Sequence, residues 1–177
     1  MMNPSPAPQS VFTSWVEEHR GILVKVARSF TGSPADAADL QQDLMLQIWM
    51  SLPSYRGHAK PSTWIYRVCL NTALTWRRGT ARRERLVEPG ADLGRLPARG
   101  ASPAEAAGQR DLLDQLYQAI QGMPRFDRVL VLLMLDGLAY REIAEVTGLT
   151  ENHVGVALTR ARKRLAEMMK GAADELE

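Results

Sequence analysis

The sequence predicts an all-α fold in which two small helical domains are joined by a flexible linker. Seven segments carry apolar residues at helical spacing, and none alternates as a half-buried strand would. No aromatic residue occurs between Trp76 and Tyr117, and glycines and prolines interrupt the middle of that stretch. We therefore expect an N-terminal domain over 11–79, a linker of roughly 25 residues over 80–104 and a C-terminal domain over 105–170.

Each domain has its own set of expected helices. The N-terminal helices are expected at 11–30, 34–52 and 62–78. The C-terminal helices are expected at 104–122, 124–136, 140–147 and 150–169. The residues that interrupt helices between the two sets are Gly79, Pro89, Gly90, Gly94, Pro97, Gly100 and Pro103.

Charge is separated along the chain. The 177 residues include 22 basic and 20 acidic ones, so the net charge is only +2. Residues 29–55 contain no Lys or Arg, whereas residues 77–85 contain five Arg. Such separation favours a protein partner at one surface and nucleic acid at another.

Several classes of protein are disfavoured by the composition. Cys69 is the only cysteine, so the chain can form no internal disulfide and no thiolate zinc site. The longest apolar run, 129–135, is seven residues, far below the ~20 that a membrane span requires. The first residues lack the basic and apolar regions of an export signal. We expect a cytoplasmic protein with no membrane insertion, no metal and no cofactor.

Residues 140–165 have the pattern of a helix-turn-helix that reads duplex DNA. Ala144 is small enough for the helix crossing, Gly148 tolerates a positive φ at the turn, and Val154 anchors the second helix. Thr150 supplies the N-cap hydroxyl of that helix. The side chains expected to face DNA are Thr150, Asn152, His153, Val156, Thr159, Arg160 and Lys163. The alternative is an ordinary amphipathic helix pair, but the cluster of cations on one helix favours phosphate binding.

The helix expected at 34–52 has two different faces. Leu40, Leu44 and Ile48 share the face that we assign to the core. The far side mixes acids with apolar groups, namely Asp39, Gln42, Asp43, Leu46 and Met50. A solvated face with two stray hydrophobic residues is the simpler interpretation. A protein-docking surface explains the apolar residues better, because an isolated Leu or Met gains nothing in water.

The helix expected at 62–78 presents an aromatic ring, cations and polar side chains along one stripe. Its buried side is expected to contain Ile65, Val68, Cys69, Thr72 and Ala73. The stripe and the loop before it contain Tyr55, Arg56, Trp64, Arg67, Asn71, Thr75 and Arg78. These residues are candidates for binding single-stranded DNA, because rings stack on unpaired bases while Asn and Arg bind base edges and phosphates. The alternative is a surface helix with Trp64 packed under the loop.

The order and spacing of several motifs point to one family. The motifs are Asp39-Leu-Gln-Gln-Asp43, Ile48-Trp49, Tyr55-Arg-Gly57, Ser62-Thr-Trp-Ile-Tyr-Arg67 with Asn71, and the segment from Gly122-Met-Pro124 to Arg164. Together they resemble a bacterial sigma factor of the extracytoplasmic-function group of the sigma-70 family. The resemblance covers nearly the whole chain outside the linker and the termini. One departure is Gly155-Val-Ala157, where the family often has a basic or hydroxyl-bearing run.

The resemblance implies a specificity subunit of RNA polymerase, and not an enzyme. In that family the first domain binds core RNA polymerase and melts the minus-ten promoter element, and the second domain reads the minus-thirty-five element as duplex. By this resemblance, docking falls on Asp39, Gln42 and Asp43, with Leu46 on the same face. Strand opening falls on Trp64, Arg67 and Asn71 with the Tyr55 loop, and duplex reading falls on 152–163. The expected partners are core RNA polymerase, promoter DNA and an anti-sigma factor, which the family usually has.

Two other classes of protein are alternatives. A helix-turn-helix regulator would bind duplex DNA without any polymerase-docking role, but its N-terminal half should resemble a sensor or a dimerisation unit. A nucleic-acid hydrolase would need a carboxylate cluster or a histidine base, whereas His19, His58 and His153 are dispersed. Association with core polymerase distinguishes these classes.

Overall fold

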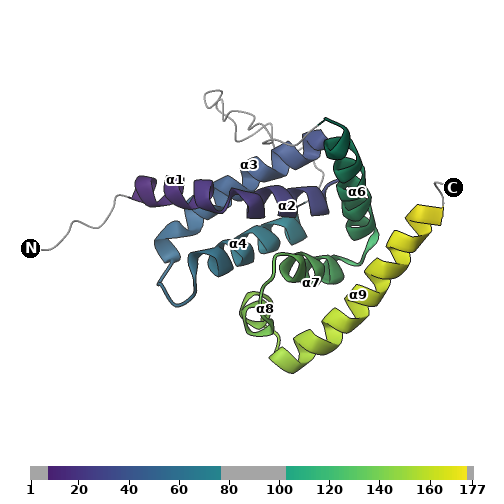
Figure 1. Ribbon diagram of the computed structural model, residues 1–177. Coiled ribbons are helices and arrows are strands. Elements are labelled where there is room, and N and C mark those ends of the chain that lie inside the picture. Colours follow the sequence, from purple (N-terminus) through teal and green to yellow (C-terminus); the bar gives the residue numbers. More distant parts are fainter. Residues whose placement is uncertain (1–7, 77–102, 175–177) are drawn as a thin grey trace, which may run out of the picture.

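A computed structural model of the chain describes residues 8–76 and 103–174, with side chains over 8–76 and 110–170 (Figure 1). Its helices are α1 (Pro8–Glu18), α2 (Arg20–Phe30), α3 (Pro34–Ser51), the 3-10 helix η1 (Leu52–Ser54), α4 (Pro61–Thr75), α6 (Pro103–Gly122), α7 (Arg125–Leu135), α8 (Tyr140–Thr147) and α9 (Glu151–Asp174). Throughout these ranges the regular structure is helical, which confirms the predicted all-α class with two helical groups. Arg78 and residues 80–102 of the expected linker lie outside the described residues.

Three helices, α2, α3 and α4, form the core of the N-terminal group. Leu40, Leu44 and Ile48 of α3 are fully buried there, as their spacing predicts. α3 begins with Pro34 in its first turn, and the Ser33 hydroxyl accepts a hydrogen bond from the Asp36 amide at 3.1 Å. The buried stripe fixes the rotation of α3, so its acidic and apolar far side points away from the core.

The prediction of one helix over 11–30 is wrong. The helix is interrupted at His19, whose φ of −106° and ψ of 17° are not helical, and a second helix, α2, begins at Arg20. Gly21 lowers helix propensity directly after the break. The break allows Phe12 and Trp15 of α1 to pack on rings outside the bundle while α2 turns its own apolar face to the core.

Two other helix ends differ from the expectation. α4 ends at Thr75, before the expected end at 78, and Trp76 is extended with φ −61° and ψ 124°. The Trp76 indole donates a hydrogen bond to the Asp43 carboxylate at 3.1 Å, which holds this residue against α3. α9 continues to Asp174, beyond the expected end at 169, because no proline follows to stop it.

The C-terminal group consists of α6, α7, α8 and α9, and α9 packs on the other three. Ile120 of α6, Val131 of α7 and Ala161 of α9 share one buried cluster. A second part of α9, through Val154 and Leu158, belongs to a cluster that extends into the N-terminal group. α9 therefore packs against the rest of the protein along most of its length, and one of its faces is exposed to solvent.

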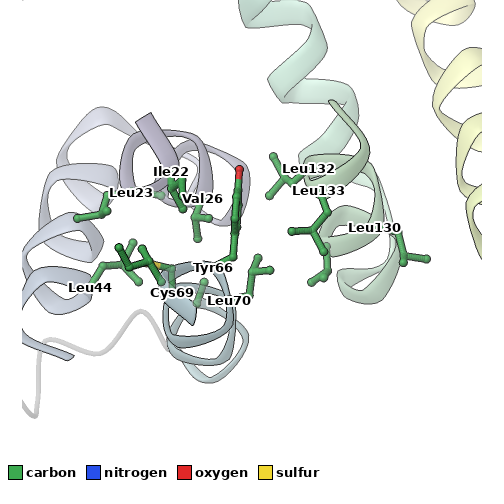
Figure 2. Close-up of a cluster of buried hydrophobic side chains, with 14 of the residues drawn as sticks. Ile22, Leu23, Val26, Leu44, Tyr66, Cys69, Leu70, Leu130, Leu132 and Leu133 are labelled. Carbon is green, nitrogen blue, oxygen red and sulfur yellow. The ribbon is translucent and has the colours of Figure 1, made fainter. Parts of the chain in front are cut away.

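The two groups are in direct contact: α4 packs on α8, and α2 packs on α6 and α7 (Figure 1). Figure 2 shows Tyr66 of α4 lying between Val26 of α2 and Leu132 and Leu133 of α7, all within one buried cluster. Tyr66 and Leu70 were assigned to neither face of α4 by the sequence pattern, and both are buried in the cluster that includes Leu132 and Leu133 of α7. The expected buried side was otherwise correct, although Val68 and Thr72 are only half-buried.

Candidate nucleic-acid and partner interfaces

The helix-turn-helix has the expected geometry. Gly148 adopts a φ of 76° at the end of α8, a conformation that favours glycine, and its amide donates to the Ala144 carbonyl at 2.8 Å. The Thr150 hydroxyl accepts a hydrogen bond from the His153 amide at 3.4 Å, so Thr150 caps α9 as predicted. Val154 is fully buried and anchors α9. The turn therefore fixes which side of α9 faces outward.

The outward side of α9 carries the side chains that the sequence proposes for duplex DNA. Asn152, His153, Val156, Thr159, Arg160 and Lys163 are all exposed. The Thr159 hydroxyl donates to the Gly155 carbonyl at 2.9 Å, which reduces its freedom to reach a base. Among the other cations of this helix, Arg164 forms an ion pair with Asp127 of α7, so it is partly neutralised within the protein. Arg160 and Lys163 are exposed on this side, and Lys163 lies 4.0 Å from a carboxylate oxygen of Glu167 within α9.

Gly155 lies under an aromatic ring of the neighbouring helix. A Cβ atom at this position would lie 3.4 Å from Cε2 of the Tyr140 ring, which rests on α9 from the start of α8. Tyr140 and Val156 are both substantially exposed beside this contact. Tyr140 was not among the residues predicted for this surface. The glycine at 155, in the middle of an otherwise outward-facing run, was the one local sign that a neighbouring ring lies over this turn.

The stripe on α4 is divided between exposed and packed residues. Arg67, Asn71 and Thr75 are exposed, whereas Trp64 is half-buried. The Trp64 ring packs edge-on against Tyr55, with centroids 5.5 Å apart, and also approaches the ring of Trp15. This arrangement favours the alternative in which Trp64 supports the loop.

The loop before α4 is closed by its own contacts. The Tyr55 hydroxyl donates to the Ala59 carbonyl at 2.6 Å, and its ring lies 4.8 Å from that of Trp15. Arg56 and His58 are exposed at the tip. Gly57 has a φ of 75°, which allows the tight turn. The cation Arg56 is therefore presented outward from a supported loop.

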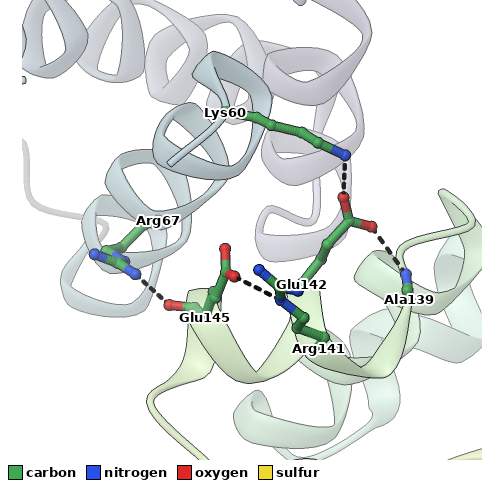
Figure 3. A network of polar contacts seen from close by, with 6 residues as sticks. All are labelled: Lys60, Arg67, Ala139, Arg141, Glu142 and Glu145. Carbon is green, nitrogen blue, oxygen red and sulfur yellow. Dashed lines mark hydrogen bonds and ion pairs between the residues drawn. The ribbon is translucent and has the colours of Figure 1, made fainter. Parts of the chain in front are cut away.

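Polar contacts join α4 and the loop before it to α8 (Figure 3). Lys60 forms an ion pair with Glu142 at 2.7 Å, and the Arg67 guanidinium donates to the carbonyl of Glu145. The hydrogen bond from Lys60 lowers the pKa of Glu142, and the same hydrogen bond raises the pKa of Lys60. Glu142 also accepts from the Ala139 amide at 3.0 Å, which caps the start of α8.

The far side of α3 exposes large apolar residues beside polar ones. Leu46 and Met50 are 56% and 64% exposed, and Gln42 lies exposed beside them. Asp39 and Asp43 are half-buried, and Asp43 accepts the hydrogen bond from the Trp76 indole. Exposed apolar surface of this kind is typical of a protein-docking site.

Trp49 was missing from the residues that the sequence assigned to this face. Its side chain is 42% exposed and packs edge-on against Phe12, with centroids 5.2 Å apart. Trp49 lies seven residues after Gln42, so helical spacing could have placed it on this face.

A surface hollow brings two of the predicted surfaces together. It is lined by Asp43 and Leu46 of α3 and by Asn71 and Thr75 of α4, among others. A partner bound on α3 would therefore lie next to the polar stripe of α4. Among the described helices, none is long and apolar enough to cross a membrane.

These features define a class of protein: a two-part helical protein with a helix-turn-helix in its second part and exposed apolar side chains on one helix of its first. Two family models match the chain, "Sigma-70 region 2" over residues 15–83 and "Sigma-70, region 4" over residues 113–165. The chain belongs to the sigma-70 family of RNA polymerase sigma factors and, within it, to the extracytoplasmic-function (ECF) group. The family resemblance seen in the sequence is confirmed.

Individual relatives agree with this assignment. The ECF RNA polymerase sigma factor SigE of Mycolicibacterium smegmatis is 28% identical over 94% of this chain and 66% of its own length. SigG of Mycobacterium tuberculosis, also an ECF sigma factor, is 30% identical over 98% of this chain and 52% of its own length. The chain thus spans about half to two thirds of the length of these curated relatives.

A solved structure shares the fold. The sigma factor RpoE of Bartonella quintana, in complex with the anti-sigma factor NepR, superimposes with a TM-score of 0.62 over 90% of this chain and 96% of that chain. The two sequences are 20% identical, so the likeness supports the arrangement of helices.

Proposed function

We propose that this chain binds core RNA polymerase and directs promoter-specific initiation of transcription, by recognising and melting promoter DNA. The observation that carries the proposal is the shared hollow, in which the docking residues Asp43 and Leu46 adjoin Asn71 and Thr75. Polymerase bound on α3 would hold an opened DNA strand next to α4. The alternative, a regulator that binds duplex DNA alone, gives no role to this arrangement and is not favoured by the region 2 match.

The proposal gives each surface one task. Asp39, Gln42, Asp43 and Leu46 dock on polymerase. Tyr55, Arg56, Trp64, Arg67, Asn71, Thr75 and Arg78 serve the minus-ten strand, with Tyr55 and Trp64 acting through support of the loop. Thr150, Asn152, His153, Val156, Thr159, Arg160 and Lys163 serve the minus-thirty-five duplex, Thr150 by capping α9. The corresponding domains are 11–79 and 105–170, with 80–104 as the connector.

The cellular setting follows from this role. A sigma factor works beside the chromosome, so we infer a cytoplasmic location. It contributes binding free energy while polymerase performs the phosphodiester chemistry, so the chain is a specificity factor and not an enzyme. We also propose an anti-sigma factor as a partner, since RpoE of Bartonella quintana was solved with one.

The test is competition for core RNA polymerase by the variant Asp39→Lys/Asp43→Lys. Charge reversal beside Leu46 should abolish core binding and transcript formation on fragmented genomic DNA of the source bacterium. Glu17→Lys/Asp111→Lys changes the net charge equally at two exposed positions outside α3 and should behave as the parent. Circular dichroism checks that helicity is retained, because Asp43 also binds Trp76.

Parental affinity of the Asp39→Lys/Asp43→Lys variant for core polymerase would refute the docking assignment. If the parental chain binds duplex DNA but gives no transcript with core polymerase, the result would instead support a regulator that binds duplex DNA without polymerase.

A further inference from the structure

The loop between η1 and α4, residues 55–60, has little apolar surface with which to fix its own shape. Its exposed members are Arg56, Gly57, His58 and Lys60. Tyr55 and Ala59 are half-buried. The Tyr55 hydroxyl donates to the Ala59 carbonyl at 2.6 Å, which ties one end of the loop to the other. The position of the Tyr55 ring therefore sets where the loop closes.

Tyr55 belongs to an aromatic triangle, in which Trp15, Tyr55 and Trp64 each contact the other two. The Tyr55 ring meets Trp15 edge-on, with centroids 4.8 Å apart and an interplanar angle of 88°, and it meets Trp64 at 5.5 Å. The rings of Trp15 and Trp64 are 5.9 Å apart. Edge-to-face pairs at such distances are favourable, because the positive edge of one ring meets the negative face of the next. Removal of one ring would weaken the support of the other two.

Trp15 reaches the aromatic triangle from α1, at the periphery of the N-terminal group. The structure describes the whole of α1, and none of its residues is buried. The helix contacts α2, α3 and η1 (Figure 1), whereas the buried residues of the N-terminal core come from α2, α3 and α4. Its two aromatic side chains have different partners, since Phe12 meets Trp49 of α3 and Trp15 meets the triangle. Trp15 is thus the ring through which α1 supports the loop.

The supported loop carries a guanidinium and an imidazole at its tip. Arg56 directly follows Tyr55 in the chain, and Gly57, with a φ of 75°, turns the backbone before His58. A shift of the Tyr55 ring would therefore change the direction in which Arg56 and His58 point. Side chains that select a ligand need to be held within about 0.5 Å of their productive position by the residues behind them.

We propose that Trp15 is a positioning residue for selection of a minus-ten base. Its ring supports Tyr55 and Trp64, and these hold the loop in the shape in which Arg56 and His58 meet the unpaired strand. The inference rests on the proposed function, because it needs the loop to bind that strand. Trp15 acts through Tyr55 and does not itself contact DNA. Its loss affects the choice of base more than polymerase docking or duplex binding, which use α3 and α9.

A purely stabilising role for Trp15 predicts a different result. Truncation would then lower the stability of the fold and the fraction of active protein. It would leave the ratio between favoured and disfavoured bases unchanged, because that ratio is measured within one preparation and is independent of the active fraction. Base preference therefore separates positioning from stability.

The test compares truncations of two aromatic residues on the same helix. Trp15→Ala removes a ring from the aromatic triangle, and Trp15→Phe keeps a ring there. The control, Phe12→Ala, removes a ring that packs on Trp49 of α3, with centroids 5.2 Å apart. Circular dichroism checks the folding of each full-length chain.

Two measurements are made on each chain. Brief digestion with trypsin, followed by mass spectrometry, gives the rate of cleavage after Arg56 and so reports how firmly the loop is held. Each chain, with saturating core polymerase, then selects from forked templates in which the unpaired minus-ten strand is randomised. The parent template is a promoter recovered by run-off transcription from genomic fragments.

Trp15→Ala should be cleaved after Arg56 about tenfold faster than the parent. Its preference for the favoured minus-ten base should fall about fivefold to tenfold, the scale of one or two aromatic contacts. Trp15→Phe should retain most of the protection and most of the preference. Phe12→Ala should keep the parental cleavage rate at Arg56 and the parental base preference.

Parental cleavage in Trp15→Ala would overturn the proposal, since the loop would then not depend on this ring. Faster cleavage with an unchanged base preference would also overturn it, because Trp15 would only stabilise the fold. An equal loss of preference in Phe12→Ala would have the same consequence, since the effect would belong to α1 as a whole. Failure of the proposed function is a separate result, the absence of transcript from the parental chain, and the cleavage measurement needs no polymerase.

Discussion

At the residue scale, Cys69 shows how burial changes chemistry without creating a site. Its side chain is fully buried between α4 and its neighbours, and burial raises the pKa of the thiol to about 12 from an ordinary value of 9.0. The thiolate is the reactive form, so the fold protects the only cysteine of the chain from oxidation and alkylation.

We predict that Cys69 in the native protein reacts with an aromatic disulfide reagent near pH 8 about a thousandfold more slowly than in the unfolded chain. The factor follows from the difference in thiolate fraction. Measurement of reagent release in buffer and in concentrated guanidinium chloride checks it, and Cys69→Ala defines the background. Rapid stoichiometric reaction of the folded protein would contradict the assignment of Cys69 to the core.

The same pKa has a consequence for stability. The folded state holds the thiol proton more tightly, so this contribution is complete below about pH 9 and is lost as the pH rises toward 12. Titration of other groups affects the parent and Cys69→Ala alike. The free energy of unfolding should therefore fall more steeply above pH 9 in the parent than in Cys69→Ala.

Individual site residues were predictable where local geometry sets their role. Gly148 and Thr150 follow from turn and capping chemistry, which depends on neighbours within a few residues. Trp64 was harder, because its packing on Trp15 depends on a helix break at His19 that apolar periodicity does not reveal. Tyr140 was missed because its partner is a glycine on another helix.

At the element scale, we expect α9 to divide its length between base reading and phosphate binding. Its first turns present Asn152, His153 and Val156, and Arg160 and Lys163 follow one and two turns later. Gly155, within the first of these groups, lies under the Tyr140 ring and presents no side chain of its own. The helix should therefore read sequence at its start and gain affinity further along.

Substitution of two exposed residues should separate these contributions. Lys163→Ala should weaken binding to all duplexes similarly and reduce the salt slope by about one unit, whereas Asn152→Ala should relax preference at one or two base pairs and cost about 1 to 3 kcal/mol on the favoured site. The measurement is selection from a randomised duplex pool by the full chain at two salt concentrations. Selection of the parental sequences by Asn152→Ala would place base reading elsewhere.

Helix positions were largely predictable, since the apolar stripe of α3 and the pattern of α8 contain enough local information. The sequence predicted the side of α4 that packs within its own helical group, but not the side that packs on the C-terminal group. One side of α4 meets α2 and α3, whereas another side meets α8, and Tyr66 packs beside Leu132 and Leu133 of α7 (Figure 2). A single-sequence pattern cannot tell a residue buried by its own domain from one buried by another.

At the scale of the whole molecule, contacts between residues far apart in the chain decide the arrangement. Asp136 lies 70 residues from Tyr66 and 111 residues from Lys25. Local propensity carries no information about such pairs, so the sequence could predict two helical parts and not their closure. The family and its motifs were recognisable, because they depend on short segments in a fixed order.

The closed arrangement relates the three surfaces of the protein to one another. The docking side of α3 and the outward side of α9 remain exposed, while the cations of α4 are engaged by α8.

The central claim is that α4 holds melted promoter DNA within the polymerase complex. Permanganate footprinting tests it most directly, using core polymerase with each variant on a promoter recovered by run-off transcription from genomic fragments. Arg67→Ala and Asn71→Ala should lower the reactivity of the minus-ten thymines, while protection of the minus-thirty-five duplex remains. Full thymine reactivity in both variants would contradict the account.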